Sequence, residues 1–234
     1  SKVTEAYENY EFHIMYHTIH NFCTVDLSSI YLDILKDRMY AEKLDDPARR
    51  SAQTVMYHIL SSLVRMVAPV LSFTAEEVWR YIPKKEGTAR SVLLSDWPQA
   101  EADHLDADLS ETWKKRLAIR GELTKFLEMA RRNKTIGHSL DAAITIYADG
   151  DTYAVLKDMD TYLSTFLIVS EAHVKEGVAQ AHAEAVTGEE LPLAAVVEAS
   201  KLEKCERCWI HRPTVGDDKA HPTICDRCSS VLEG

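Results

Sequence analysis

A chain of 234 residues, 46% apolar and 27% charged, has the composition of an ordinary globular protein with one large or two smaller domains. It contains no run of about 18 apolar residues, which excludes a membrane-spanning helix. The formal net charge of -10 argues against a uniformly nucleic-acid-binding surface. Charge is unevenly distributed, however: residues 113–134 carry eight basic residues against two acidic ones.

The first 40 residues have helical periodicity. Apolar residues recur at helical spacing on two stripes through residues 1–22, which predicts one helix buried on two sides, as in a bundle. Asp26 is a suitable N-cap residue. It predicts a second helix that runs from Leu27 to about Tyr40.

Two further helices are predicted before residue 83. An acidic pair followed by Pro47 at the first helical position opens a helix that ends before Pro69. The sequence Thr74-Ala-Glu-Glu77 matches a capping box and predicts a short helix through Tyr81. After a polar loop, residues 91–98 predict a short extended piece. Residues 1–83 are therefore interpreted as a helical bundle.

The middle of the chain changes its pattern. Residues 106–132 predict a long amphipathic helix, with Leu117 among its inward-facing residues and basic residues on its other sides. Apolar or β-branched runs then predict three short strands, with a short helix between the first two. The strands span residues 143–147, 167–169 and 193–197, and the helix spans residues 152–159.

The most specific pattern lies near the C-terminus, where Cys205 and Cys208 are followed, after sixteen residues, by Cys225 and Cys228. Two cysteine pairs with this spacing are typical of a four-thiolate zinc site. Four protein ligands leave no open position for a catalytic water, so the predicted ion is structural. The sequence therefore predicts a metal-stabilised binding module at this end of the chain.

Two alternatives to this ligand set remain open. His211 and His221 lie between the cysteine pairs and could each replace a thiolate. Disulfides would need an oxidising compartment, and nothing at the N-terminus resembles a signal peptide. Cys23 is left over and fits a small core position. We therefore expect a reducing, cytoplasmic environment and one bound zinc ion.

Several segments, spread in order over essentially the whole chain, carry a family resemblance. They are residues 8–13 (Glu-Asn-Tyr-Glu-Phe-His), 20–23 (His-Asn-Phe-Cys), 26–29 (Asp-Leu-Ser-Ser), 31–38 (Tyr-Leu-Asp-Ile-Leu-Lys-Asp-Arg), 69–79 (Pro-Val-Leu-Ser-Phe-Thr-Ala-Glu-Glu-Val-Trp), 132–140 (Arg-Asn-Lys-Thr-Ile-Gly-His-Ser-Leu) and the module from Cys205 to Cys228. These segments resemble the anticodon-binding bundle and C-terminal zinc module of class I, bacterial-type isoleucyl-tRNA synthetases. The valyl and leucyl enzymes have a related bundle, but the four-cysteine module favours the isoleucyl member.

The resemblance implies a mainly α fold: a helical bundle (1–98), a basic helix with a small α+β junction domain (99–200) and a four-cysteine zinc module (201–234). The chain lacks His-Ile-Gly-His, Lys-Met-Ser-Lys-Ser and the repeat of a nucleotide-binding fold. The resemblance thus implies the C-terminal part of an ATP-dependent isoleucine–tRNA ligase. Activation, transfer and editing would belong to its N-terminal catalytic part, and this fragment alone would be inactive.

The implied partners are isoleucine-accepting tRNA and that catalytic part, with no membrane and no second copy. Trp209 and Arg207 would contact unpaired bases from the zinc knuckle, although Trp209 could instead pack over the zinc core. Basic residues at helix ends would contact phosphates, although each could be an ordinary surface charge. These phosphate candidates are Arg131, Arg132, Lys134, Lys36, Arg38, Arg49 and Arg50.

Two other hypotheses remain. The chain could be an acidic helical and zinc-containing module that binds proteins and no RNA, which its net charge of -10 would favour. It could also be an internal scaffold that docks on the catalytic part and has little RNA affinity of its own. Salt-dependent tRNA binding would separate these hypotheses from the first.

Overall fold

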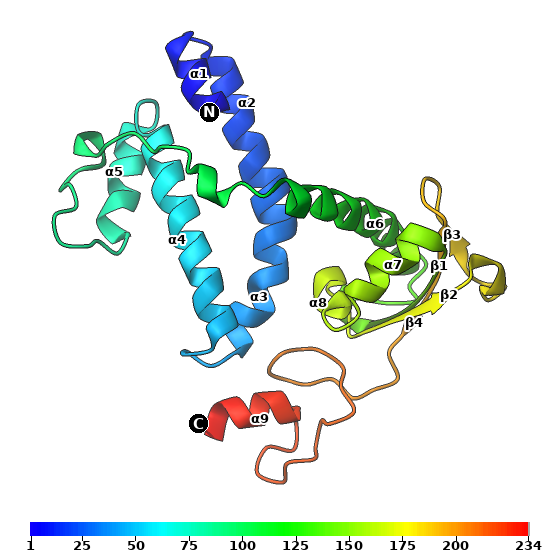
Figure 1. The fold of residues 1–234 in the computed structure, drawn as a ribbon. Helices are drawn as coiled ribbons and strands as arrows, with labels where there is room; N and C mark the ends of the chain where they lie inside the picture. Colours follow the sequence, from blue (N-terminus) through cyan, green and yellow to red (C-terminus); the bar gives the residue numbers. More distant parts are fainter. Residues whose placement is uncertain (234) are drawn as a thin grey trace. The chain divides into compact units, whose positions relative to one another are not determined.

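The structure is a computed structural model that describes residues 1–233. Contacts divide the chain into two compact units, unit 1 (Ser1–Leu105) and unit 2, which begins at Asp106. Within the described residues, no helix combines the length and the apolar character needed to cross a membrane. The mainly helical class with a small sheet is confirmed (Figure 1).

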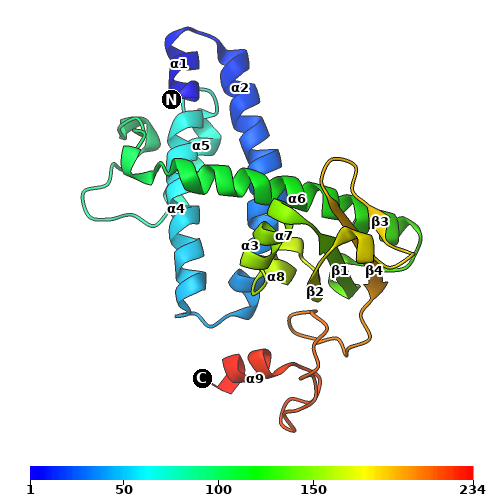
Figure 2. The same cartoon turned by 45° about the vertical axis from the view of Figure 1, so that its right-hand side comes forward.

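Unit 1 contains only helical elements. A short first helix turns back beside the second, which continues through a π-helical segment into the third (Figures 1 and 2). The fourth helix contacts both the third and the fifth. The elements are α1 (Lys2–Glu8), α2 (Phe12–Asn21), the π-helix η1 (Phe22–Tyr31), α3 (Leu32–Ala41), α4 (Pro47–Val67), α5 (Ser72–Tyr81) and the 3-10 turns η2 (Val92–Leu94) and η3 (Ala102–His104).

Two small apolar cores hold unit 1 together. One joins α4, α5 and η2 around Trp79, whose indole N–H donates to the carbonyl of Ala89 at 3.0 Å. The other joins α1 and α2 around Met15, with Trp97 packed against it. Trp97, which is partly buried, donates to Thr4 Oγ1 at 3.0 Å, so both indole N–H groups have partners.

The prediction of one helix over residues 1–22 is wrong. The chain breaks at Tyr10, which has a left-handed φ of 59°. The N–H of Glu11 donates to the carbonyl of Ala6 at 2.7 Å, and the N–H of Tyr10 donates to that of Tyr7 at 3.1 Å. These bonds form a Schellman motif, in which the position of Tyr10 usually holds glycine. Tertiary contacts stabilise the break, because the ring of Tyr7 packs edge-on against that of Trp97.

The predicted helix start at Asp26 is also wrong, since Asp26 lies inside η1 and the helical path is continuous from Phe12 to Ala41. In this segment side-chain hydroxyls bond carbonyls five residues earlier. Ser28 Oγ donates to the carbonyl of Cys23 at 2.8 Å, and Ser29 Oγ donates to that of Thr24 at 2.7 Å. The hydroxyls thus follow the wider turn of the π-helix rather than cap a new helix.

The start of α4 agrees with its prediction, because the Asp46 carboxylate accepts the N–H of Arg49 at 2.9 Å. The predicted capping box at residues 74–77 is wrong, since α5 already begins at Ser72. The extended piece predicted at residues 91–98 is interrupted by η2, although Ser91 and Ser95 on either side of that turn are extended. There the carboxylate of Glu76 accepts the N–H of Val92 at 3.0 Å and so fixes the turn.

Unit 2 has one layer of helices against a four-stranded sheet. The strand order is β2-β1-β4-β3, with β1 and β2 parallel and the other pairs antiparallel. Figures 1 and 2 show α6, α7 and α8 grouped beside the sheet. The elements are α6 (Ala107–Arg132), the 3-10 turn η4 (Ser139–Asp141), β1 (Ala142–Ala148), α7 (Gly150–Asp158), α8 (Leu163–Leu167), β2 (Glu171–Glu176), the 3-10 turn η5 (Val178–Gln180), β3 (Val186–Thr187), β4 (Leu193–Ala199) and α9 (Asp226–Glu233).

The predicted helix at residues 106–132 and the first and last predicted strands are confirmed as α6, β1 and β4. The strand predicted at residues 167–169 is wrong. The apolar run there ends α8, and Ile168 takes a left-handed φ of 58°. The real strand, β2, is a mostly polar edge strand, so it lacks the apolar run that was used as the signal. Leu117, expected to face inward, is 37% exposed.

A buried carboxylate fastens the β3–β4 connection to α6. Glu122 is only 3% exposed, and its Oε2 accepts the N–H of Glu189 at 2.9 Å. Its Oε1 accepts from Lys125 Nζ at 2.7 Å. Next to it, a Cβ at Gly188 would lie 2.8 Å from the carbonyl oxygen of Leu191, so a side chain there would force the connection apart.

Glu122→Gln should lower the free energy of unfolding of unit 2 by about 1–3 kcal/mol, because a charged acceptor with two donors is lost. The hydrogen bond from Lys125 holds the pKa of Glu122 below its ordinary value. A lowered pKa gives stability that is present above the unfolded pKa, about 4.3, and is lost as the pH falls through the folded value. The mutant should therefore lose less stability than the parent on acidification.

Urea unfolding at neutral pH and near pH 3 measures both effects. The control is Glu128→Gln, on the same helix, whose carboxylate pairs with Arg131 at the surface. That change should cost less than about 1 kcal/mol. Equal losses for the two variants would contradict the role assigned to Glu122.

Candidate zinc centre and nucleic-acid surface

The four cysteines near the C-terminus converge on one point. Cys205 and Cys208 lie on a turn, while Cys225 and Cys228 lie at and within the start of α9. All four Sγ atoms lie within 4.8 Å of one another. Cys208 Sγ and Cys225 Sγ are 3.9 Å apart. A tetrahedral ion with bonds of about 2.3 Å requires sulfur atoms about 3.8 Å apart, so this cluster fits zinc.

Backbone groups of the knuckle favour the thiolate form at Cys205. Burial opposes its ionisation, but N–H groups of Cys208, Cys225 and Arg207 point at its sulfur and lower the pKa of Cys205 to about 6. The N–H of Cys225 lies 3.3 Å from that sulfur. Burial raises the pKa values of Cys208 and Cys225. A bound metal cation would deprotonate all four coordinating thiols, including the two whose pKa values are raised. The cluster therefore fits a metal site better than a group of four neutral thiols.

Neither histidine near the cluster replaces a thiolate. His211 Nδ1 lies 2.6 Å from the carbonyl oxygen of Leu202, and its Nε2 lies 3.5 Å from Asp141 Oδ1. His211 thus joins the module to the rest of unit 2. His221 instead lines a pocket beside the cluster. The ligand-atom cluster consists of the four cysteines.

The zinc knuckle presents one large aromatic residue to solvent. Trp209 is 62% exposed and has a left-handed φ of 65°. The apolar core around the cysteines is formed by Ile224 with Val215 and does not include Trp209. Exposure therefore argues against the alternative that Trp209 packs over the zinc core. A large side chain held in a strained backbone conformation is typical of functional positions.

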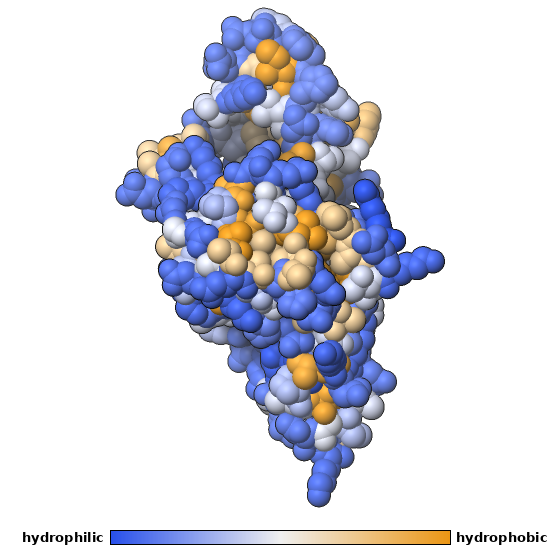
Figure 3. Space-filling model, turned by 90° about the vertical axis from the view of Figure 1, so that its right-hand side faces the viewer, coloured by the Kyte–Doolittle hydropathy of each residue, from blue (hydrophilic) through white to orange (hydrophobic). Residues whose placement is uncertain are grey.

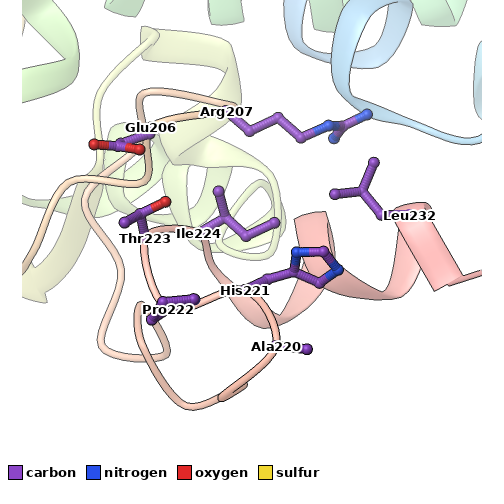
Figure 4. A pocket seen from close by; sticks show the side chains of 8 residues that line it. All are labelled: Glu206, Arg207, Ala220, His221, Pro222, Thr223, Ile224 and Leu232. Atoms are coloured by element: carbon purple, nitrogen blue, oxygen red, sulfur yellow. The ribbon is translucent and has the colours of Figure 1, made fainter.

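A pocket of about 390 Å³ adjoins this knuckle. Figure 4 shows the Arg207 side chain extending along one side toward Leu232, with the His221 ring across from it. Arg207 Nη1 also lies 3.5 Å from Cys228 Sγ, which ties its position to the cluster. The pocket thus combines cationic, aromatic and apolar groups. Its lining residues are Glu206, Arg207, Ala220, His221, Pro222, Thr223, Ile224 and Leu232.

The positions of His221 and Leu232 in the pocket could not be predicted from the sequence, because both depend on how the loop and α9 fold around the cysteine cluster. The only signal was the position of His221-Pro222 just before the second knuckle. Leu232 has no such signal, since it lies outside the cysteine pattern.

The basic end of α6 supplies a second set of predicted contacts. Arg131 is paired with Glu128 at 2.5 Å. Within residues 1–233, the side chains of Arg132 and Lys134 have no ion-pair or hydrogen-bond partner, and both are exposed. Lys134 has a left-handed φ of 61°. The N–H of Thr135 donates to the carbonyl of Ala130 at 2.9 Å, which places Lys134 at the usual glycine position of a Schellman motif.

Lys134→Gly should raise the free energy of unfolding by about 1 kcal/mol, because glycine adopts this φ without a Cβ clash. The matched control is Lys114→Gly inside α6, which should lower it by about 1 kcal/mol. Urea unfolding of both variants gives the comparison. A loss of stability in Lys134→Gly would show that its side chain has a structural role.

The remaining candidates lie in unit 1, at the end of α3 and the start of α4. Lys36 is paired with Asp33 at 2.6 Å, and Arg50 Nη1 lies 3.3 Å from Gln53 Oε1 at the surface. Arg49 donates to the carbonyl of Glu42 at 2.8 Å and so stabilises the turn between the helices. Arg38 lies in the last turn of α3. The structure thus places Arg49 in the scaffold and leaves the other three on the surface or partly exposed.

Comparison with known protein families identifies the family to which the helical bundle belongs. The model of the anticodon-binding domain of tRNA ligases matches residues 1–146. The chain belongs to this family. A second model, of a zinc finger found in FPG and IleRS, matches residues 203–231, which contain the four cysteines. Cluster and match together assign a structural zinc ion to this end of the chain.

Several relatives match along the whole chain. The isoleucine–tRNA ligase of Moorella thermoacetica is 46% identical over 234 residues, covering 100% of this chain and 25% of that protein. That of Carboxydothermus hydrogenoformans is 48% identical over 234 residues, covering 99% of this chain and 24% of that protein. That of Geobacter sulfurreducens is 47% identical over 99% of this chain. The chain therefore spans about a quarter of the length of the curated relatives it matches and corresponds to their anticodon-binding and zinc-finger portion.

Proposed function

We propose that this chain binds the anticodon arm of an isoleucine-accepting tRNA and positions it for an isoleucine–tRNA ligase. The observation that carries the proposal is Trp209, a 62% exposed aromatic residue held in a left-handed conformation on the zinc knuckle. Sequence-specific RNA recognition favours unpaired loop bases that stack on aromatic or arginine planes. Trp209 and the neighbouring Arg207 offer both kinds of surface.

The zinc ion would have a structural role. Cys205, Cys208, Cys225 and Cys228 would ligate it as thiolates, which closes the coordination shell and leaves no catalytic position. When bound, the ion supplies folding free energy to a segment with little core of its own. The knuckle would then be rigid, so Arg207 and Trp209 could meet a base without first being ordered.

Affinity would come mainly from phosphate contacts. Arg132 and Lys134 are the first candidates, because both are exposed and without side-chain partners among the described residues. Further phosphate contacts would come from Arg131, Lys36, Arg38 and Arg50, whether or not these side chains give up their present partners. Arg49 is a weaker candidate because it bonds the carbonyl of Glu42. Phosphate contacts set affinity and register, whereas base contacts set specificity.

In the whole enzyme, attachment of isoleucine to tRNA with ATP would occur in the catalytic part outside this chain. Holding the anticodon arm would contribute entropically, since a bound tRNA reacts as if the step were unimolecular. The isolated chain would have no ligase activity and would act as a monomer. Its proposed domains keep the predicted limits, residues 1–98, 99–200 and 201–234.

A salt series tests this proposal against a protein-binding module or a scaffold without RNA affinity. The zinc-loaded chain should bind isoleucine tRNA with an affinity that falls linearly on a log–log plot as salt rises. The slope gives the number of neutralised phosphates. Absence of binding at low salt would favour the other two hypotheses, which the net charge of -10 allows.

A further inference from the structure

The outer edge of β4 is only partly covered by β3. The ladder between them pairs Val186 with Ala195 and Thr187 with Ala194, and the N–H of Gly188 donates to the carbonyl of Leu193 at 2.8 Å. In an antiparallel pair, the N–H and C=O groups of every second residue point toward the partner strand, and those of the residues between them point away from it. Peptide groups of odd-numbered β4 residues therefore face β3, and those of even-numbered residues face β1.

The same alternation leaves a free edge. The N–H of Ser200 donates to the carbonyl of Asp141 on the β1 side, in agreement with this direction. The peptide groups of Val197 and Ala199 must then face away from β1. Because β3 pairing stops at Val186, these groups have no strand partner within residues 1–233. Unpaired strand edges are templates for another extended chain.

A groove of about 500 Å³ lies along this free edge. Its far wall is the end of α6, where Met129 is 43% exposed beside buried Phe126 and Ala130. Figure 3 looks onto the side where Figure 1 draws the sheet, and apolar residues gather near its middle. The groove is lined by Phe126, Met129, Ala130, Asn133, Thr135, Glu184, Val186, Ala195, Val196, Val197, Glu198, Ala199 and Lys201.

The β4 side of the groove carries mainly negative charge, whereas the cations Arg132 and Lys134 flank Asn133 at its α6 end. Glu184 and Glu198 line it against one cation, Lys201. Residues 149–200, which include β2, β3 and β4, carry ten acidic residues against two lysines. The β4 side of the groove would therefore attract a basic polypeptide.

We propose that this groove binds an extended, basic segment of a partner protein, which adds a strand to the free edge of β4. Backbone bonds to Val197 and Ala199 would give affinity, and side-chain pockets would give specificity. A residue opposite Val197 would point its side chain to the α6 side, toward Met129 and Phe126. Its neighbours would point to the other side, where Glu198 lies. The recognised pattern is therefore apolar and basic residues in alternation.

The test uses the zinc-loaded chain and a synthetic peptide of alternating valine and lysine, titrated by calorimetry. Ala199→Pro removes only the N–H that faces the groove and should weaken binding about tenfold or more. Ala199→Val keeps that N–H and is the matched control. Glu198→Lys should weaken the binding of the valine–lysine peptide and strengthen the binding of a valine–glutamate peptide. N-methylation of the peptide should abolish binding.

Met129→Lys, on the exposed side of α6, gives a second variant if Ala199→Pro does not fold, and it should also weaken the basic peptide. Thermal unfolding checks each variant. Peptide binding that is absent at millimolar concentration, or unchanged by Ala199→Pro and Glu198→Lys, would overturn the proposal. So would self-association blocked by these substitutions, or displacement of the peptide by single-stranded RNA that occupies the groove.

Discussion

Replacing Cys225 with serine is expected to abolish zinc binding and unfold the C-terminal module, while the helices of unit 1 remain formed. Cys225 is fully buried, and its sulfur is one of the four that converge within 4.8 Å. Apparent zinc-binding free energies of such small sites are about 10–16 kcal/mol, most of which appears as folding free energy. The apolar core of the module, built mainly on Ile224 and Val215, is too small to replace that contribution.

Metal analysis and circular dichroism measure this effect. Cys23→Ser is the matched control, because Cys23 is the one cysteine outside the cluster and lies in η1. It should keep its zinc and its thermal unfolding profile. A Cys225→Ser variant with a full complement of zinc would contradict the four-thiolate site.

Replacing Trp209 with alanine is expected to weaken tRNA binding by about 1–3 kcal/mol, because one base would lose its stacking platform. The backbone conformation at this position makes Trp209→Gly more informative. Glycine relieves the left-handed strain, so stability should rise by up to about 1 kcal/mol while affinity falls. Opposite changes in stability and affinity distinguish a binding residue from a packing residue.

Filter binding and urea unfolding of the same preparations provide both readouts. Trp113→Ala is a useful contrast, because the Trp113 ring packs edge-on against Phe166 at 5.8 Å. That variant should lose stability and keep its tRNA affinity. If Trp209→Gly lost stability and kept its affinity, Trp209 would have to be reassigned to the fold.

Sequence predicted the elements whose signals are local. The cysteine spacing required no knowledge of the rest of the fold, because two short knuckles suffice to bring four sulfurs together. The start of α4 was predicted from the acidic pair before Pro47, and the Asp46 carboxylate accepts the N–H of Arg49. The start of α6 was predicted from its apolar periodicity, and there the Asp106 carboxylate accepts the N–H of Leu109. β1 and β4 were predicted because they are buried, apolar strands.

Features decided by tertiary contacts were missed. Tyr10 and Ile168 occupy left-handed positions at which sequence reasoning expects glycine, so neither helix end had a signal. β2 is a polar edge strand, and its pairing depends on β1 rather than on its own composition. Glu122 has the pattern of a surface residue, yet it is buried because it bonds the backbone of Glu189.

In the candidate site, too, some features follow from local sequence and others from tertiary contacts. Its metal ligands follow from spacing, whereas the state of each basic residue depends on neighbours distant in sequence or on local geometry. Arg49 turns out to support a turn, and Lys134 is held in a strained conformation. The pocket beside the knuckle needs α9 to fold back toward Arg207, which no short motif encodes.

Anticodon recognition by this chain can be measured with an anticodon exchange. The zinc-loaded chain is titrated with isoleucine tRNA and with the same tRNA in which only the anticodon has been replaced. We expect the replacement to weaken binding by about 1–3 kcal/mol for each base that loses a specific contact, with the salt slope unchanged. Equal affinity for the two tRNAs would contradict anticodon recognition by this chain.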